Sequence, residues 1–260
     1  MQTTTRMPAA FIGHGSPMNA LETNRHTEAW RTFAGSAPTP RALLVISAHW
    51  YINASAVTTM ARPRTIHDFF GFPKQLFDFE YPAPGLPELA DEIAELTQPI
   101  WIGKDMDSWG LDHGTWSVLC HMYPQADVPV VQLAINAAQP LEYHLALGAS
   151  LAALRDSGVM IIGSGNVVHN LGMLDFSDPE LGFDWAMRFN EKAKELVATN
   201  PGDVASLGTD PDFRNSVPTP DHFIPFLYFA GLAAESDQTA EVITDGYMAG
   251  SLSMTSWTLN

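Results

Sequence analysis

Histidines are the residues of this chain best suited to metal chemistry, and three of the nine follow apolar runs typical of buried strands. His14 comes two residues after the run 9–12, and His49 three residues after the run 42–46. His169 follows the run 158–162 and a short Gly-Ser-Gly-Asn turn. Because the carboxyl ends of strands in an open α/β sheet meet at one edge, we expect these imidazoles to lie close together.

Two further histidines stand beside predicted helices. Thr219-Pro220 is typical of a helix start, with a capping hydroxyl and a proline in the first turn, so His222 is expected in the first turn of a helix over 221–234. His113 lies at a Gly-flanked turn before a predicted helix over 115–122. We expect both histidines to be exposed, at places where the backbone can direct their side chains toward a site.

Imidazoles drawn from separate strand ends favour a catalytic metal site over a structural one. Neutral imidazole binds divalent transition metals, and such an arrangement leaves coordination positions open for a substrate. A structural zinc site usually has four closed ligands with several cysteines, whereas this chain has only Cys120. Cys120 itself is interpreted as a small core residue on a helix. A single histidine beside a strand is more often a structural residue than a ligand. The prediction of a metal site therefore depends on several histidines lying at the same edge of the sheet.

The alternation of apolar runs and helical patterns predicts an α/β fold. We expect one domain over residues 1–260, with a central, mainly parallel sheet flanked by helices and the metal site at the strand carboxyl ends. The predicted strands are 9–12, 42–46, 128–135 and 158–162, and the predicted helices are 86–96, 115–122, 141–155, 185–198 and 221–234.

The segment 62–85 differs from the rest of the chain because it combines four prolines with six aromatic residues. Long ordered connections of this kind are usually functional. We interpret it as a long, ordered excursion over one face, of the kind that forms a lid or a binding segment. His67, with Asp68 and Phe69 beside it, is expected to contact the substrate. His26, His121 and His144 are interpreted as structural or solvent-facing.

Composition excludes several classes of function. A formal net charge of −16 opposes nucleic-acid binding. The most apolar stretch, 224–234, is too short to span a membrane, and the first residues lack the pattern of a signal peptide, so we expect a cytoplasmic protein. No Gly-x-Gly-x-x-Gly follows a strand, so no organic cofactor is expected. The sequence does not determine the oligomeric state, and a homo-oligomer is compatible with it.

Seven ordered motifs over nearly the whole chain resemble the class III extradiol ring-cleaving dioxygenases, and within them the DOPA 4,5-dioxygenase-like branch. They are Gly13-His14-Gly15-Ser16-Pro17-Met18, Ser47-Ala48-His49-Trp50, Thr65-Ile66-His67-Asp68-Phe69, Tyr81-Pro82-Ala83-Pro84-Gly85, Gly110-Leu111-Asp112-His113-Gly114-Thr115-Trp116, Ser164-Gly165-Asn166-Val167-Val168-His169-Asn170 and Gly250-Ser251-Leu252-Ser253-Met254.

The resemblance implies one Fe²⁺ or Zn²⁺ per chain, bound by His14, His49 and His222. His169 would be a further ligand or an acid/base, and His113 the general base. The implied substrates are a small aromatic diol and O2. Relatives that cleave protocatechuate supply a glutamate as third ligand. An all-histidine set also suits zinc, so the identity of the metal stays open.

Two other functions are compatible with the same residues. A zinc-dependent hydrolase would use these ligands to lower the pKa of a bound water. A non-catalytic binding protein would keep the fold without a productive metal site. The presence of all five histidines of the resemblance argues against this second alternative.

Overall fold

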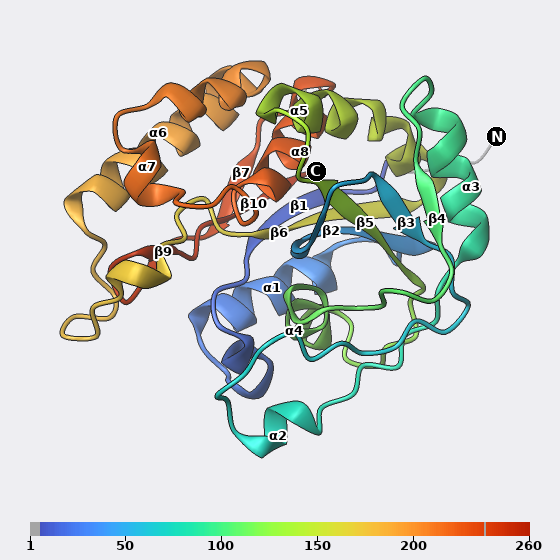
Figure 1. Ribbon diagram of the computed structural model, residues 1–260, viewed down its shortest axis with the longest axis horizontal. Coiled ribbons are helices and arrows are strands. Elements are labelled where there is room, and N and C mark those ends of the chain that lie inside the picture. Colours follow the sequence, from blue (N-terminus) through green and yellow to red (C-terminus); the bar gives the residue numbers. More distant parts are fainter. Residues whose placement is uncertain (1–5, 237) are drawn as a thin grey trace.

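A central sheet of eight strands organises the computed structural model, which describes residues 6–236 and 238–260 (Figure 1). The strand order is β4-β3-β5-β2-β6-β1-β10-β7. The four middle strands are mutually parallel: β5 (Val130–Asn136), β2 (Ala42–Ile52), β6 (Val159–Gly165) and β1 (Ala9–Gly13). The sheet is extended by β3 (Ala56–Thr58), β4 (Gly103–Asp105), β10 (Ser256–Leu259) and β7 (Glu241–Thr244).

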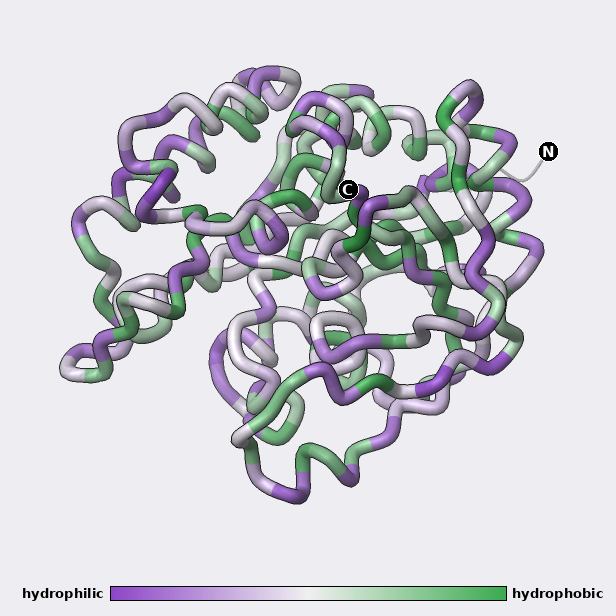
Figure 2. Tube along the Cα trace, in the orientation of Figure 1, coloured by the Kyte–Doolittle hydropathy of each residue, from purple (hydrophilic) through white to green (hydrophobic). Residues whose placement is uncertain are grey.

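The middle strands are buried on both faces, which explains their unbroken apolar sequences. Every residue of β1 is buried. Its successive side chains enter two different apolar cores, Ala9 and Phe11 on one face and Ala10 and Ile12 on the other. Figure 2 shows the apolar colour along these strands and on the helices that meet them.

One layer of helices covers each face of the sheet (Figure 1). The first core receives side chains from α3 (Pro87–Leu96), α5 (Leu141–Ser150), α6 (Asp184–Thr199) and α8 (Ile224–Ala234). The second core receives them from α1 (Arg25–Ser36) and α4 (His113–Met122). The predicted fold class is therefore confirmed: a mainly parallel sheet flanked by helices.

The remaining described elements are short. They comprise α2 (Lys74–Phe77), α7 (Phe213–Ser216), the 3-10 helices η1 (Pro17–Leu21), η2 (Ala152–Ser157), η3 (Leu171–Met173) and η4 (Pro201–Thr209), and the two-stranded sheet β8 (Tyr247–Met248) with β9 (Leu252–Ser253). No helix in the described residues has both the length and the apolar character needed to cross a bilayer.

Most predicted elements are present, with three differences that matter for the site. Helix α4 begins at His113, two residues earlier than predicted for 115–122, so His113 lies in the helix and not in a turn before it. Strand β2 continues to Ile52, so His49 lies within it rather than beyond it. Pairing of β2 with β5 shifts register between Ile46 and Tyr51, which frees the backbone around His49 from a regular ladder. Helix α8 begins at Ile224, three residues later than predicted for 221–234, and no side chain caps it. The proposed Thr219 cap is therefore wrong, and His222 lies in the turn before the helix.

The segment 62–85 is an ordered excursion on the face covered by α4. Phe79 stacks on Trp116 of α4 with ring centres 5.1 Å apart, and the Tyr81 hydroxyl donates to the carbonyl of Tyr123. Phe70, by contrast, is 91% exposed. The excursion is thus anchored by part of its aromatic set.

Candidate metal centre

Five histidines from five separate segments converge at the carboxyl end of the parallel strands. His14 follows β1, His49 lies in β2, and His169 follows β6. His113 is the first residue of α4, and His222 precedes α8. Each histidine has a ring centre within 5.3 Å of at least one other. The predicted convergence of distant imidazoles is present in the structure.

His14, His49 and His222 form a nearly equilateral triangle of rings. Their centres are 5.2 Å (His14 to His49), 5.3 Å (His14 to His222) and 5.0 Å (His49 to His222) apart. An imidazole that binds an ion through one nitrogen at about 2.0–2.1 Å has its ring centre about 3.2 Å from that ion. Three such rings at near-tetrahedral angles have centres about 5.2 Å apart. The ring spacing of this triangle is therefore compatible with three imidazoles around one ion, and binding of a metal by this set stays a prediction.

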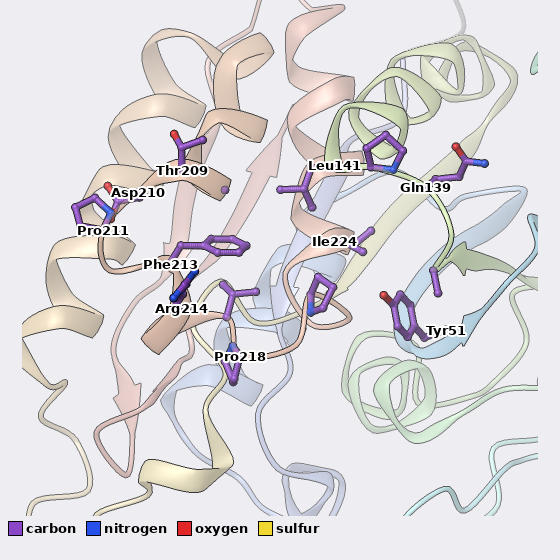
Figure 3. A pocket seen from close by; sticks show the side chains of 15 residues that line it. Tyr51, Gln139, Leu141, Thr209, Asp210, Pro211, Phe213, Arg214, Pro218 and Ile224 are labelled. Carbon is purple, nitrogen blue, oxygen red and sulfur yellow. The ribbon is translucent and has the colours of Figure 1, made fainter.

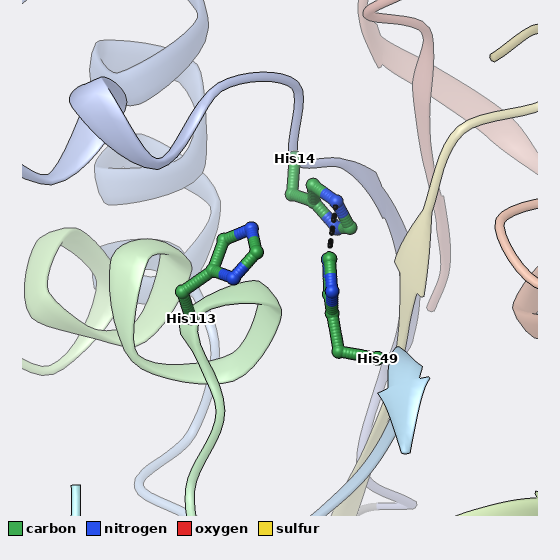
Figure 4. Close-up of side chains that lie close together, drawn as sticks. All are labelled: His14, His49 and His113. Carbon is green, nitrogen blue, oxygen red and sulfur yellow. Dashed lines mark hydrogen bonds between the residues drawn. The ribbon is translucent and has the colours of Figure 1, made fainter. Parts of the chain in front are cut away.

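The nitrogen atoms of His14 and His49 give a second test of metal binding. Their Nε2 atoms are 3.4 Å apart (Figure 4). Two nitrogens that bind one ion at a tetrahedral angle are separated by about 3.4 Å. The chemistry and spacing of the donors thus fit a divalent metal.

His113 approaches the same two imidazoles from α4 (Figure 4). Donor atoms of His14, His49 and His113 all lie within 4.8 Å of one another, so these three also form a candidate metal group. The ring centre of His113 is 3.8 Å from that of His49 and 6.0 Å from that of His14. Ring spacing therefore favours His14, His49 and His222, whereas donor-atom spacing groups His14 and His49 with His113.

Hydrogen bonds at Nδ1 orient four of the five rings. Asp68 contacts His49 Nδ1 at 3.0 Å and His113 Nδ1 at 2.9 Å, and Asp221 contacts His222 Nδ1 at 2.5 Å. An ionised carboxylate only accepts hydrogen bonds, so each of these Nδ1 atoms carries the proton. In a neutral ring this leaves the Nε2 lone pair for a metal or an incoming proton.

The fourth anchored ring is His14, whose Nδ1 lies 2.9 Å from the Ser164 hydroxyl. That hydroxyl donates its single proton to the Gly114 carbonyl at 2.6 Å. Ser164 must therefore accept the hydrogen bond from His14 Nδ1–H. The Nε2 lone pair of His14 is again left free, and it faces His49.

Burial and mutual repulsion keep most of the cluster neutral. Burial, followed by the charges of the other histidines, holds the pKa of His14 and of His222 well below the ordinary value. Burial and the neighbouring His49 also lower the pKa of His113, against the opposing effect of Asp68. Burial lowers the pKa of His169 to about 4. Neutral imidazoles are the forms that bind metals.

His49 is the exception among the five. Burial lowers its pKa, but the hydrogen bond to Asp68 and the charges of Asp112 and Asp68 outweigh burial, so the net shift of the pKa is upward. The pKa of Asp68 shifts the opposite way. Burial raises it, but the hydrogen bonds to His113 and His49 outweigh burial and hold the pKa of Asp68 below its usual range. Asp68 is therefore a carboxylate throughout the neutral pH range.

The start of α4 is fixed against β2 by buried hydrogen bonds. The Ser47 hydroxyl donates to Asp112 Oδ1 at 2.7 Å, and Asp112 caps the helix by accepting from the Thr115 amide at 3.1 Å. At Gly114 an added Cβ would lie 2.6 Å from Ser47 Oγ and 2.7 Å from His49 Cδ2. Glycine is thus required for this close approach of α4 to His49.

His169 stands apart from the anchored rings. It stacks on His222 with ring centres 3.5 Å apart and an angle of 2° between the planes. Its backbone amide donates to the Ser216 carbonyl at 2.8 Å. The position suits either predicted role, further ligand or acid/base, and that choice stays a prediction.

The structure places the three predicted substrate contacts differently from one another. Phe69 lies at the cluster, with its ring centre 5.5 Å from that of His113 in an edge-to-face arrangement. Asp68 uses both carboxylate oxygens on histidines, a role that sequence analysis missed. His67 contacts the Phe79 carbonyl at 2.8 Å and packs inside the excursion. Contact of these residues with the substrate stays a prediction.

Two expectations about exposure are wrong. His113 and His222 were expected on the surface, but they are only 6% and 7% exposed. Phe69 of the excursion packs on His113, and His222 packs against His14 and His49. Of the other histidines, His26, His121 and His144 are buried and each contacts a polar group, consistent with structural roles.

Cys120 lies on α4, as predicted, and is half-buried against the second core. Burial raises the pKa of its thiol to about 12, so the thiol stays protonated at neutral pH. The predicted interpretation as a small core residue on a helix agrees with this environment.

A cavity of about 980 Å³ lies next to the cluster, on the side of α5, α7 and α8 (Figure 3). The segment 217–220 contributes to its wall and leads directly into His222, while Tyr51 enters it from β2, two residues beyond His49. None of the five histidines lines it. The cavity and the histidine cluster are therefore neighbours that share the segment before α8.

Comparison with known proteins gives a consistent family. The family described as the catalytic LigB subunit of aromatic ring-opening dioxygenase matches residues 8–258. A protein of Escherichia coli (strain K12) named 4,5-DOPA dioxygenase extradiol is 45% identical over 260 residues, covering 98% of this chain and 96% of the relative. A Beta vulgaris protein of the same name is 38% identical, covering 95% and 94%.

Structural similarity agrees with these relatives. The crystal structure of an uncharacterized Escherichia coli K12 protein matches with a TM-score of 0.86 and 39% identity, covering 98% of this chain and 100% of the other. The histidine cluster described above fits a metal cofactor in this family. The chain therefore belongs to the LigB family of extradiol ring-opening dioxygenases, in the DOPA 4,5-dioxygenase-like branch, and is a non-haem, metal-dependent enzyme.

Proposed function

We propose that this enzyme uses O2 to open the ring of a catechol of the DOPA type, beside its two hydroxyl groups. The convergence of the five histidines carries the proposal, because the ring spacing of His14, His49 and His222 is compatible with three ligands of one ion. The names of the relatives support the substrate class.

His14, His49 and His222 would hold the metal through their free Nε2 atoms. When bound, the metal supplies Lewis acidity toward the diol oxygens and, if it is iron, redox chemistry toward O2. Zinc has no redox chemistry, so we propose Fe²⁺ as the working ion. Bound through Nε2, all three imidazoles would be neutral donors, which would leave both charges of a divalent ion to be balanced by an anionic substrate and by nearby Asp68 and Asp221.

His113 is the proposed general base. Its Nδ1–H is held by Asp68, so its Nε2 is the atom that accepts a proton from a catechol hydroxyl. The imidazolium that results is stabilised by the same carboxylate. His169, stacked on His222, is a second buried imidazole within the cluster for later proton transfer.

Phe69 and the anchored part of the excursion wall the region in front of His113. Phe69 packs edge-to-face on His113 and also against Phe77 and Trp116. An aromatic wall next to the base suits a flat aromatic substrate and limits the entry of water.

Oxygen consumption tests the proposal directly. Iron-reconstituted protein is mixed with L-DOPA under air and under anaerobic conditions. We expect uptake of O2 and a yellow ring-opened product in air only. Hydrolysis of an ester or amide without O2 would instead support the zinc hydrolase. Absence of any bound transition metal after gentle purification, measured by elemental analysis, would support a non-catalytic binding protein.

A further inference from the structure

Asp68 connects two histidines to which the proposed function gives different tasks. One carboxylate oxygen, Oδ2, contacts His49 Nδ1 at 3.0 Å. The other, Oδ1, contacts His113 Nδ1 at 2.9 Å and accepts from the His113 backbone amide, also at 2.9 Å. A single carboxylate therefore anchors both a proposed ligand and the proposed base.

We propose that Asp68 is a shared positioning residue, which holds His49 and His113 in the Nδ1–H form so that both Nε2 atoms are free. The inference rests on the proposed function for the roles of the two histidines. Asp68 reaches them from the excursion, whereas His49 lies in β2 and His113 in α4. The excursion thus completes the metal centre from outside the sheet.

The arrangement around the two oxygens makes the consequence of an amide substitution specific. An asparagine has one accepting oxygen and one donating NH2 group. The atom that replaces Oδ1 must accept two hydrogen bonds from His113, one from Nδ1–H and one from the backbone amide. The amide oxygen of the asparagine is therefore favoured at that position. The NH2 group of the asparagine then faces His49 Nδ1–H, so two hydrogen-bond donors point at each other. His49 relieves this by moving its proton to Nε2, the atom proposed to bind metal.

The experiment compares wild type with Asp68→Asn and a control, Asp78→Asn. Asp78 lies in the same excursion, and its carboxylate forms an exposed ion pair with Lys74, with no other side-chain partner among the described residues. Long-range ¹H–¹⁵N NMR on metal-free protein at mildly alkaline pH reports which ring nitrogen carries the proton. Titration with Co²⁺, followed by visible absorption, reports metal affinity. Neither measurement needs a catechol or O2.

We expect Nδ1–H rings at both positions in wild type and in Asp78→Asn. In Asp68→Asn, His49 should change to the Nε2–H form while His113 does not. Co²⁺ affinity should fall about 10- to 100-fold, the usual effect of removing a hydrogen-bond partner from a metal ligand. Asp68→Glu, which keeps two accepting oxygens, should recover part of that loss.

Two results would overturn the inference: an Nε2–H form of either ring in wild type, or unchanged rings and Co²⁺ affinity in Asp68→Asn. The wild-type spectrum alone tests the first, even if a variant fails to fold. Failure of the proposed function is distinguishable, because wild type would then consume no O2 with catechols while the ring tautomers remain as expected.

Discussion

The hydrogen-bond partner of each Nδ1 atom determines what the histidines of this enzyme present to a metal or substrate. Asp68, Asp221 and Ser164 together accept hydrogen bonds from four Nδ1–H groups. Each neutral ring then has a single free nitrogen, so ligand direction and tautomer are set before a metal arrives. Removing such a hydrogen-bond partner from a metal ligand usually lowers metal affinity by about 10- to 100-fold.

Alanine substitutions should separate metal ligands from the base. We expect His14→Ala and His49→Ala to lose bound metal, because each removes an Nε2 donor of the 3.4 Å pair. His113→Ala should keep its metal and lose turnover, since only the proton acceptor is removed. Elemental analysis and O2 uptake measure the two effects. Equal loss of metal in all three variants would instead place His113 among the ligands.

Ser164→Ala tests the anchoring of His14. The substitution removes the side-chain acceptor of His14 Nδ1–H, so the ring can rotate or change tautomer. We expect about a 10-fold loss of metal affinity, at the lower end for such partners. Ser117→Ala, which deletes a buried hydroxyl that has no hydrogen-bond partner in the described residues, is the control and should not change affinity. Identical affinities in the two variants would argue against the anchor.

At the scale of elements, the position of α4 against β2 decides whether the histidines can meet. Asp112 caps the helix and accepts from Ser47 on β2, so one carboxylate ties the two elements together. The irregular pairing of β2 with β5 beyond Ile46 lets His49 enter the site from within a strand. Packing between elements therefore supplies the proximity that local sequence spacing does not.

Gly114→Ala should damage the site although alanine is the better helix former. The added Cβ would lie 2.6 Å from Ser47 and 2.7 Å from His49, so α4 or β2 must shift. We expect lower thermal stability and at least about a 10-fold loss of metal affinity, of the size seen when a ligand loses its support. Gly35→Ala in α1 is a matched control, because, apart from its chain neighbours and the nearby backbone of its own helix, no atom of the described residues lies within 4 Å of the methyl group it would add. That control should be neutral or stabilising by up to about 1 kcal/mol.

At the scale of the whole molecule, burial of a histidine between helices α5 and α8 makes stability depend on pH. His144 on α5 is fully buried beside the Tyr228 hydroxyl of α8, and burial lowers its pKa to about 4. The unfolded chain, with an ordinary pKa of about 6.5, binds a proton more readily. The stabilising contribution is therefore complete above pH about 6.5 and is lost as pH falls toward 4.

Replacing His144 with glutamine should weaken this dependence. Between about pH 7.5 and about pH 5 the wild-type free energy of unfolding should fall by about 2 kcal/mol more than that of His144→Gln. Urea denaturation at both pH values measures this difference in the free energy of unfolding. The protein is kept metal-free with a chelator, so that release of a metal at low pH does not contribute. An equal pH dependence in both proteins would show that His144 does not titrate on unfolding.

Much of the fold was predictable because its signals are local. Unbroken apolar runs identified β1, β2, β5 and β6, since strands buried on both faces need no polar alternation. Helix α1 was missed although Asn24 and Thr27 form a capping box at its start. The short strands β3, β4, β7 and β10 were missed because each is defined by its pairing partner more than by its own residues.

The sequence by itself indicated that His14, His49 and His169 lie at one edge of the sheet, because parallel strands end at a shared edge; in the structure His14 and His169 follow β1 and β6, and His49 lies within β2. Only the tertiary structure decided how they are oriented and buried. His14 pairs with Ser164, 150 residues away, and His113 with Asp68, 45 residues away. Hydrogen bonds across such distances depend on how layers pack, and residue spacing along the chain carries no record of that packing.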